Sequence, residues 1–156
     1  MLIDHIRSFV IRPALQKTEL WSLAAEILLT GTILIETNCN ALKQTKGPAL
    51  GLFQIEPATH EDIKLYLAHP TNKDTLEKVL SHCEMANLPS DDELISNIKY
   101  GCLIARLIYH RNKMPLPAYD DFQGLANMYK VVYNTNMGKA NYERCIGIFK
   151  GIDHEL

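Results

Sequence analysis

The feature that most constrains this chain is an uncharged run, ILLTGTILI at residues 27–35, which leads directly into Glu36. From Thr18 onward, apolar residues recur at every third or fourth position, the spacing of one helix face. The pattern predicts a helix from Thr18 to Glu36, with the Thr18 hydroxyl as its cap. Because such a helix packs against apolar neighbours, we expect a helical protein in which a carboxylic acid stands at the end of an apolar helix.

A second long pattern, ELISNIKYGCLIARLIYHR, begins at Glu93 and follows a capping box formed by Ser90 and Glu93. Its apolar residues keep helical spacing, so we expect this helix to run through the core. Shorter helices are expected from about Asp4 with an interruption near Pro13, from Thr59 (a capping pair with Asp62) to Pro70, over residues 71–85, from Ala118 to Val132, and up to Lys150 after a turn at Tyr133–Gly138.

The length of the chain fits a single domain. With 156 residues, of which 47% are apolar, it can bury a core large enough to fold alone. We therefore predict one domain over residues 1–156, of the mainly α class, with at most one small β-hairpin between Thr37 and Ile55. Charged residues make up 22% of the chain, the net charge is −2, and no run of like charges occurs. Nucleic acid is not an expected partner, because binding to it draws on clustered Lys and Arg.

The cysteines and the N-terminus bear on compartment. Four scattered cysteines lack any C-x-x-C pair or a nearby His at metal-ligand spacing: Cys39, Cys83, Cys102 and Cys145. No metal site is expected, and the thiols are interpreted as buried residues in a reducing compartment. Asp4, His5 and Arg7 interrupt the apolar N-terminus, so we expect no signal peptide. No stretch reaches the roughly 20 apolar residues of a membrane span.

Glu36 is the first candidate for chemistry. A carboxyl group at the end of an apolar helix is partly desolvated, which raises its pKa and keeps it protonated near neutral pH. A general acid acting on a glycosidic oxygen needs this property. The alternative is a solvated surface carboxylate, although the negative end of a helix dipole disfavours a carboxylate there.

The segment after this helix, GPALGLFQIEP, is rigid, partly apolar and carries one amide. Gly47 and Gly51 allow close backbone approach, and Gln54 offers the donors and the acceptor that bind sugar hydroxyls and N-acetyl groups. Phe53 is a candidate platform for a sugar face. The alternative is a hairpin or tight loop whose apolar side chains fill the core, which we favour for the leucine and isoleucine on either side of Phe53 and Gln54.

Tyr133 and Asn134 place a phenol and an amide in a later loop that can fold back on Glu36, although a tyrosine that ends an apolar helix is also a common core residue. Three histidines have no partner arrangement and are expected as surface residues or caps: His60, His82 and His110. Neither a Ser or Cys nucleophile with a plausible His and acid nor a Gly-rich phosphate loop is present. Serine or cysteine hydrolases and nucleotide enzymes therefore have little support.

Three short motifs occur in order along the chain: IET at residues 35–37, GLFQIEP at residues 51–57 and VVYN at residues 131–134. Together they resemble the superfamily of lytic transglycosylases and goose-type lysozymes, which has a lysozyme-like fold and cleaves the glycan strands of peptidoglycan. NIKYG at residues 97–101 is similar to the family's helix before the last motif. The longer forms GPALGLFQIEPATH and YKVVYNTNMGK resemble phage-encoded members, which suggests a virus protein. The resemblance covers about residues 20–140.

The resemblance implies Glu36 as the catalytic acid and Gln54, with its neighbours Gly51 and Phe53, as contacts of the substrate groove. It also implies that Tyr133 and Asn134 orient Glu36 and the N-acetylmuramyl unit. The small β-hairpin would then lie beside the active-site groove.

Three positions depart from the family's pattern. Thr37 stands where Ser follows the acid, Phe53 stands where the strip has Met, and Val132 stands where Ala precedes Tyr. The packing around the acid is therefore expected to differ from that of the family.

The implied reaction is cleavage of the β-1,4 bond between N-acetylmuramic acid and N-acetylglucosamine. A glycosidase needs two carboxyl groups, about 5–5.5 Å apart for retention or about 6.5–9.5 Å apart for inversion. Glu56 is the possible second carboxylate, as in goose-type enzymes, and Pro57 biases it to an extended backbone. If Glu56 holds a water, the enzyme is a lysozyme. If it points away, Glu36 acts alone as acid and then base and forms a 1,6-anhydro ring; we favour this lytic transglycosylase.

Two further alternatives stay open: a catalytically inactive virion protein that is structural or binds glycan, and a glycosidase of the same fold acting on chitin or chitosan. Glu36 argues against the first, because a binder has no need for an acid at an apolar helix end. The expected partners are peptidoglycan glycan strands and possible virion proteins, and no metal or organic cofactor is implied. We expect the protein to be made in the host cytoplasm and to act on the cell wall from a phage particle or after a membrane lesion.

Overall fold

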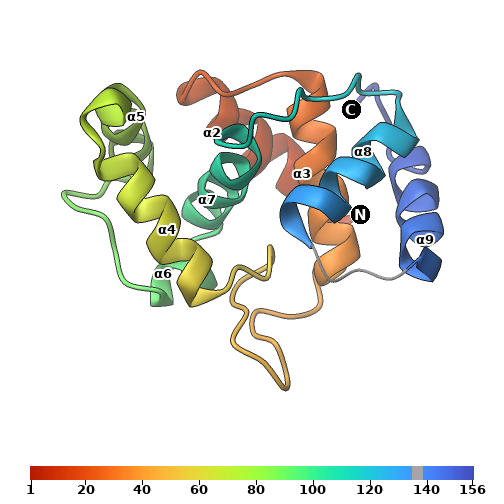
Figure 1. The fold of residues 1–156 in the computed structure, drawn as a ribbon, viewed down its shortest axis with the longest axis horizontal. Helices are drawn as coiled ribbons and strands as arrows, with labels where there is room; N and C mark the ends of the chain where they lie inside the picture. Colours follow the sequence, from red (N-terminus) through yellow and green to blue (C-terminus); the bar gives the residue numbers. More distant parts are fainter. Residues whose placement is uncertain (135–138) are drawn as a thin grey trace.

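The computed structural model describes residues 1–134 and 139–156, and these are mostly helical (Figure 1). In chain order the elements are α1 (Leu2–Ile6), the π-helical η1 (Arg7–Ile11), α2 (Arg12–Lys17), α3 (Leu23–Glu36), α4 (Pro57–Ala68), the 3-10 turn η2 (Pro70–Asn72), α5 (Lys73–Cys83), α6 (Asp92–Ser96), α7 (Ile98–His110), α8 (Phe122–Met128), the π-helical η3 (Tyr129–Tyr133) and α9 (Lys139–Lys150). Within the described residues no strand occurs, and isolated bridges pair Leu50 with Lys43 and with Ile55. The predicted mainly α class is confirmed.

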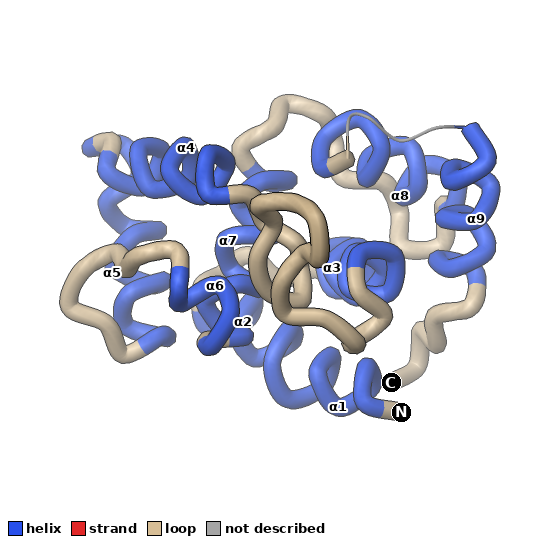
Figure 2. Tube along the Cα trace, turned by 90° about the horizontal axis from the view of Figure 1, so that it is seen from below, coloured by secondary structure: helices blue, strands red, loops and turns tan. Residues whose placement is uncertain are grey.

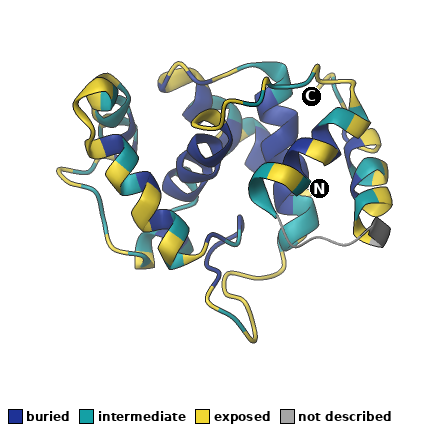
Figure 3. Ribbon diagram, viewed as in Figure 1, coloured by how far each residue is buried: buried dark blue, intermediate teal, exposed yellow. Residues whose placement is uncertain are grey.

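Helices α3 and α7 form the centre of the molecule, where Figure 3 shows most of their residues as buried. Helices α4, α5 and α6 lie on one side of this pair, and α8 and α9 lie on the other side (Figures 1 and 2). The segment 37–56 connects α3 to α4 and lies between these two groups in the view of Figure 2. The end of α3 is therefore next to the only long connection on this side of the described chain.

Helix α3 begins later than predicted. Its cap is Ser22, whose hydroxyl accepts a hydrogen bond from the Ala25 amide at 3.0 Å. Thr18 instead ends α2 and donates to the Ala14 carbonyl at 2.8 Å. The chain cannot continue as one helix between them, because Glu19 has a left-handed backbone with φ of 60°. The uncharged run nevertheless lies in a largely buried helix, as predicted.

Helix α9 packs closely on α3 at Gly31. A Cβ at Gly31 would lie 2.1 Å from Cε1 of Phe149, a ring that is completely buried. Only glycine therefore allows this contact, which fixes α9 against the helix that carries Glu36.

The second long pattern is divided at Asn97 into α6 and α7. The Asn97 side chain accepts a hydrogen bond from the Tyr100 amide at 3.1 Å and caps α7. The predicted capping box is wrong, because Ser90 offers its carbonyl rather than its hydroxyl to the Glu93 amide, at 3.3 Å. The core position predicted for this helix is confirmed, since most of α7 is buried.

The N-terminal helix continues past Pro13. In the π turn η1, the Arg12 amide bonds to the Arg7 carbonyl. Pro13 has no amide hydrogen, and its ring crowds the carbonyl four residues earlier, so a wider turn directly before it accommodates the ring. The predicted interruption is therefore a local widening.

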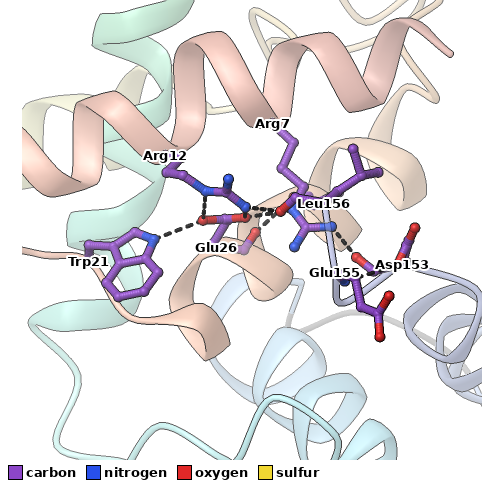
Figure 4. Close-up of polar contacts among 8 residues, drawn as sticks. Arg7, Arg12, Trp21, Glu26, Asp153, Glu155 and Leu156 are labelled. Carbon is purple, nitrogen blue, oxygen red and sulfur yellow. Dashed lines mark hydrogen bonds and ion pairs between the residues drawn. The ribbon is translucent and has the colours of Figure 1, made fainter.

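A buried ion cluster joins this N-terminal helix to α3 (Figure 4). The Glu26 carboxylate is completely buried and accepts hydrogen bonds from Arg7 Nε at 2.6 Å, Arg12 Nε at 2.9 Å and Trp21 Nε1 at 2.7 Å. Both arginines also donate to carbonyl groups of the C-terminal segment, at Asp153 and Leu156. The cluster fastens three parts of the chain together.

His60, expected at the surface, is buried in α4. Its Nδ1 lies 2.6 Å from the Asp91 carboxylate, and its Nε2 lies 2.7 Å from the Tyr100 hydroxyl. These contacts hold the start of α4 against α7. The helix starts at Pro57 rather than at Thr59, because proline fits the first turn of a helix.

The remaining predictions concern the cysteines, the last turn and membrane spans. Three cysteines are buried as predicted, and one is partly exposed: Cys83, Cys102 and Cys145, and Cys39. The final helix up to Lys150 is confirmed, while most of the turn predicted at Tyr133–Gly138 lies outside the described residues. Over the described ranges, no helix has the length and apolar character needed to span a bilayer.

Candidate active site

The strip after α3 forms a tight turn. Leu50 and Ile55 exchange two main-chain hydrogen bonds of 2.9 Å and enclose the residues between them. Gly51 has φ of +75°, and a Cβ there would lie 2.1 Å from the Leu94 carbonyl oxygen. Glycine is therefore required at this position. It anchors the turn on α6 and leaves Gln54 on the other end of the turn.

A cavity of about 390 Å³ lies between this turn, the end of α3, the start of α4, the end of α7 and η3. Five residues predicted as site residues line it: Glu36, Gln54, Glu56, Tyr133 and Asn134. The rest of its lining consists of Gln44, Ala49, Ile55, Thr59, Ile108, Arg111 and Val132. Most of these side chains are polar, and the volume is in the range of small-ligand sites.

Glu36 ends α3 and is partly exposed on the cavity wall. The Tyr129 hydroxyl donates a hydrogen bond to Glu36 Oε1 at 2.6 Å. Burial raises the pKa of the Glu36 carboxyl above its ordinary value, and the hydrogen bond from Tyr129 offsets only part of this rise. The carboxyl group therefore keeps its proton to a higher pH than a solvated glutamate does, which is the direction predicted from the sequence.

The tyrosine that contacts Glu36 is Tyr129 rather than Tyr133. The Tyr133 hydroxyl donates to the Phe53 carbonyl at 2.5 Å, and its ring stacks on the Tyr129 ring with 5.9 Å between centroids. Asn134 Nδ2 is 3.4 Å from the Tyr129 hydroxyl, to which it donates. The predicted contact of Tyr133 with Glu36 is wrong because Tyr133 comes one helical turn later and reaches the strip instead.

Phe53 and Gly51 lie in the core rather than on the cavity wall. Phe53 is 1% exposed, and its ring faces Gly101 of α7. A buried ring cannot stack on a sugar, so the prediction of Phe53 as a sugar platform is wrong. Gly51 is likewise buried and shapes the turn instead of contacting a ligand. The core alternative is confirmed for Leu52 and Ile55, which are 7% and 2% exposed.

Gln54 lines the cavity with φ of 47°, a left-handed conformation that is uncommon outside glycine. Its Nε2 donates to the Gly51 carbonyl at 2.9 Å, so the amide is held while its oxygen has no partner among the described residues. The Thr37 hydroxyl donates to the Leu52 carbonyl at 2.9 Å. This bond connects the end of α3 to the turn and fixes the acid and the amide relative to each other.

Glu56 lies on the same cavity wall and is exposed. It occupies the N-cap position of α4 with an extended backbone, φ −76° and ψ 146°, as Pro57 predicts. Its side chain makes no capping hydrogen bond. The role of Glu56 as a second carboxylate stays a prediction.

Four polar residues of the site were not predicted: Gln44, Thr59, Arg111 and Tyr129. Tyr129 had a signal, because it belongs to the same helical pattern as Tyr133 and lies one turn earlier. Arg111 had none, since it follows a long apolar helix and adjoins no motif.

Comparison of the chain with models of protein families, with curated proteins and with solved structures gave no match. The case for a function therefore rests on the residues of this chain.

Proposed function

We propose that this protein is a lytic transglycosylase with a lysozyme-like fold, which cleaves the β-1,4 bond between N-acetylmuramic acid and N-acetylglucosamine in peptidoglycan. The observation that carries the proposal is the Glu36 carboxyl, whose pKa is raised by burial while it faces a polar cavity. A general acid needs a proton at working pH and access to the substrate, and Glu36 combines both.

In this mechanism, protonated Glu36 gives its proton to the glycosidic oxygen as the bond to C1 of the muramyl sugar breaks. The resulting carboxylate is stabilised by the hydrogen bond from Tyr129. It then takes the proton of the muramyl C6 hydroxyl, whose oxygen attacks C1 and closes the 1,6-anhydro ring. Glu36 regains its proton, and no water is consumed.

Other cavity residues suit a glycan. The free amide oxygen of Gln54 can accept a hydrogen bond from a hydroxyl or N-acetyl group, and the Asn134 amide lies next to the Tyr129 hydroxyl. Gln44 and Thr59 add further polar groups to the wall. Sugar recognition depends on such fixed polar groups, so the lining supports a saccharide substrate.

Hydrolysis is the second candidate, because Glu56 lines the same cavity as Glu36. If Glu56 positions a water, the product carries a reducing end and the protein is a lysozyme. A glycan-binding or structural virion protein without turnover is the remaining alternative, and origin from a phage belongs to the same proposal.

Digestion of purified peptidoglycan tests these alternatives, with the released fragments weighed by mass spectrometry. The wild type should release fragments ending in 1,6-anhydromuramic acid, one water lighter than reducing ends. Glu36→Gln should lower the rate by roughly 10²–10⁴-fold. Glu61→Gln, which changes an exposed glutamate on α4 outside the cavity, is the matched control and should retain activity.

Each other outcome has a distinct meaning. Reducing ends would replace the transglycosylase by a lysozyme and make Glu56 the next residue to mutate. Near-normal activity of Glu36→Gln would remove Glu36 from the mechanism. No release by the wild type would leave a structural or binding role.

A further inference from the structure

Arg111 is the one basic side chain on the cavity lining that the described residues form. It stands at the end of α7, as the C-cap residue of that helix. The two acidic side chains on the same lining are Glu36 and Glu56. A site for a neutral sugar chain needs no cation on its wall, so Arg111 calls for an explanation.

Arg111 differs from three other arginines in its partners. Arg7 and Arg12 bind Glu26, and Arg106 donates to the Leu20 carbonyl at 3.0 Å. The guanidinium of Arg111 makes no hydrogen bond or ion pair with any of residues 1–134 or 139–156. The negative end of α7 favours a cation in its last turn, but it does not require that cation to border a cavity.

The chemistry of a guanidinium indicates its ligand. Its planar fork binds a carboxylate through two parallel hydrogen bonds, which makes arginine more selective for carboxylates than lysine is. N-acetylglucosamine carries no charge, and the glucosamine of chitosan is cationic. The muramyl sugar differs from both by its lactyl substituent, which ends in a carboxylate or continues into a peptide that carries carboxylates.

We propose that Arg111 binds a carboxylate carried by the lactyl substituent of the muramyl sugar, and so selects muramyl glycans over chitin and chitosan. This inference rests on the proposed function, because it places the muramyl unit in the cavity of Glu36. It makes Arg111 a specificity-determining residue and assigns the proton transfers to Glu36 alone.

Binding measured by calorimetry in a Glu36→Gln background, where substrate is not consumed, tests the assignment. Three ligands are compared: soluble peptidoglycan strands with their peptides, the same strands stripped by an amidase so that the lactyl carboxylate is free, and chitohexaose. Arg111→Gln should weaken binding of a muramyl strand by roughly ten- to a hundredfold and leave chitohexaose binding unchanged. Lys113→Gln, two residues further on and exposed, is the matched control and should bind like the parent.

The two kinds of strand identify the source of the carboxylate. A loss with stripped strands assigns Arg111 to the lactyl carboxylate, and a loss restricted to peptide-bearing strands assigns it to the peptide. Arg111→Lys should restore only part of the affinity, because lysine keeps the charge and lacks the fork.

Equal losses for chitohexaose and muramyl strands, or no loss for either kind of strand, would overturn the assignment. If the wild type still cleaves peptidoglycan in that case, the proposed function stands and only the role of Arg111 fails. If the wild type releases no fragments and the parent variant binds neither glycan, both proposals fail.

Discussion

Helix α3 carries two glutamates in contrasting environments, Glu26 near its start and Glu36 at its end. Glu26 is completely buried and accepts hydrogen bonds from two arginines and an indole. Burial alone would raise the pKa of Glu26, but these bonds together hold it below its ordinary value. Glu36 is less buried and has one neutral donor, Tyr129, so the effect of burial prevails and its pKa is raised.

The difference between the two carboxyl groups shows that depth of burial does not by itself identify a reactive acid. Glu26 has its charge matched inside the protein and is closed to ligands, so it stabilises the fold. Glu36 has its charge poorly matched and borders a cavity, so a proton or a substrate group must complete its environment. The two residues are ten positions apart on one helix and serve opposite purposes.

The largest effect is expected from Glu26→Gln. The substitution leaves the buried Arg7 guanidinium without its counter-ion, and removal of one partner of a buried ion pair typically destabilises by about 3–5 kcal/mol. Urea unfolding followed by circular dichroism measures the loss. Glu19→Gln is the control, because the ion pair of Glu19 with Lys78 is at the surface and should contribute little.

A stability of Glu26→Gln close to that of the wild type would contradict the assigned role. It would mean that the two arginines are satisfied by the carbonyl groups of Asp153 and Leu156, and that the cluster does not depend on the glutamate.

The contrast between these glutamates was predictable only in part. Glu36 stood out because it ends an uncharged run, and the burial of that run is a local property of the sequence. The partners of Glu26 come from the N-terminal helix beyond Pro13, where the sequence predicted an interruption. Pairing across that distance has no local signal, so the compensated glutamate was missed while the uncompensated one was found.

Errors elsewhere in the site have similar physical causes. Helix patterns predicted the mainly α class, since periodic burial is encoded locally, but caps were misassigned wherever two polar residues competed, as for Thr18 and Ser22. Tyr129 and Tyr133 share one face, and only the tertiary packing decides which of them reaches Glu36. Phe53 was misplaced because an aromatic residue in a loop fits either the core or a sugar platform.

A smaller effect is expected from Tyr129→Phe, which removes the one hydrogen bond donated to the Glu36 carboxyl. If the proposed mechanism holds, kcat should fall by roughly ten- to a hundredfold, because a hydrogen bond to the carboxylate formed in the reaction is lost. That bond lowers the pKa of Glu36, so its removal should raise this pKa and move the alkaline limb of the pH–rate profile to higher pH. Steady-state rates on soluble glycan across pH measure both changes.

The control is Tyr142→Phe, which removes the same hydroxyl on α9, where it bonds to the Gln123 carbonyl at 3.3 Å. It should leave kcat and the pH profile unchanged. A fall in kcat for Tyr129→Phe without a shift in the profile would show that Tyr129 supports packing near Glu36 and does not set its protonation.

The smallest effect is expected in the stability of Glu36→Gln, and its sign is the sharpest test of the contrast. Because the folded-state pKa of Glu36 is raised, the folded protein holds this proton to higher pH than the unfolded chain does. Wild-type stability therefore falls as pH rises from the unfolded value of the pKa to the folded one, and Glu36→Gln, which cannot ionise, escapes this loss. The variant should equal the wild type in acid and exceed it above that window, as urea unfolding at a series of pH values would measure. Glu26 should behave oppositely, since its lowered pKa stabilises the fold above its unfolded value and that contribution is lost as pH falls through the folded one. If Glu36→Gln were instead less stable at neutral pH, the Glu36 carboxylate would be holding the fold together, and α3 would carry two structural glutamates rather than one structural and one reactive.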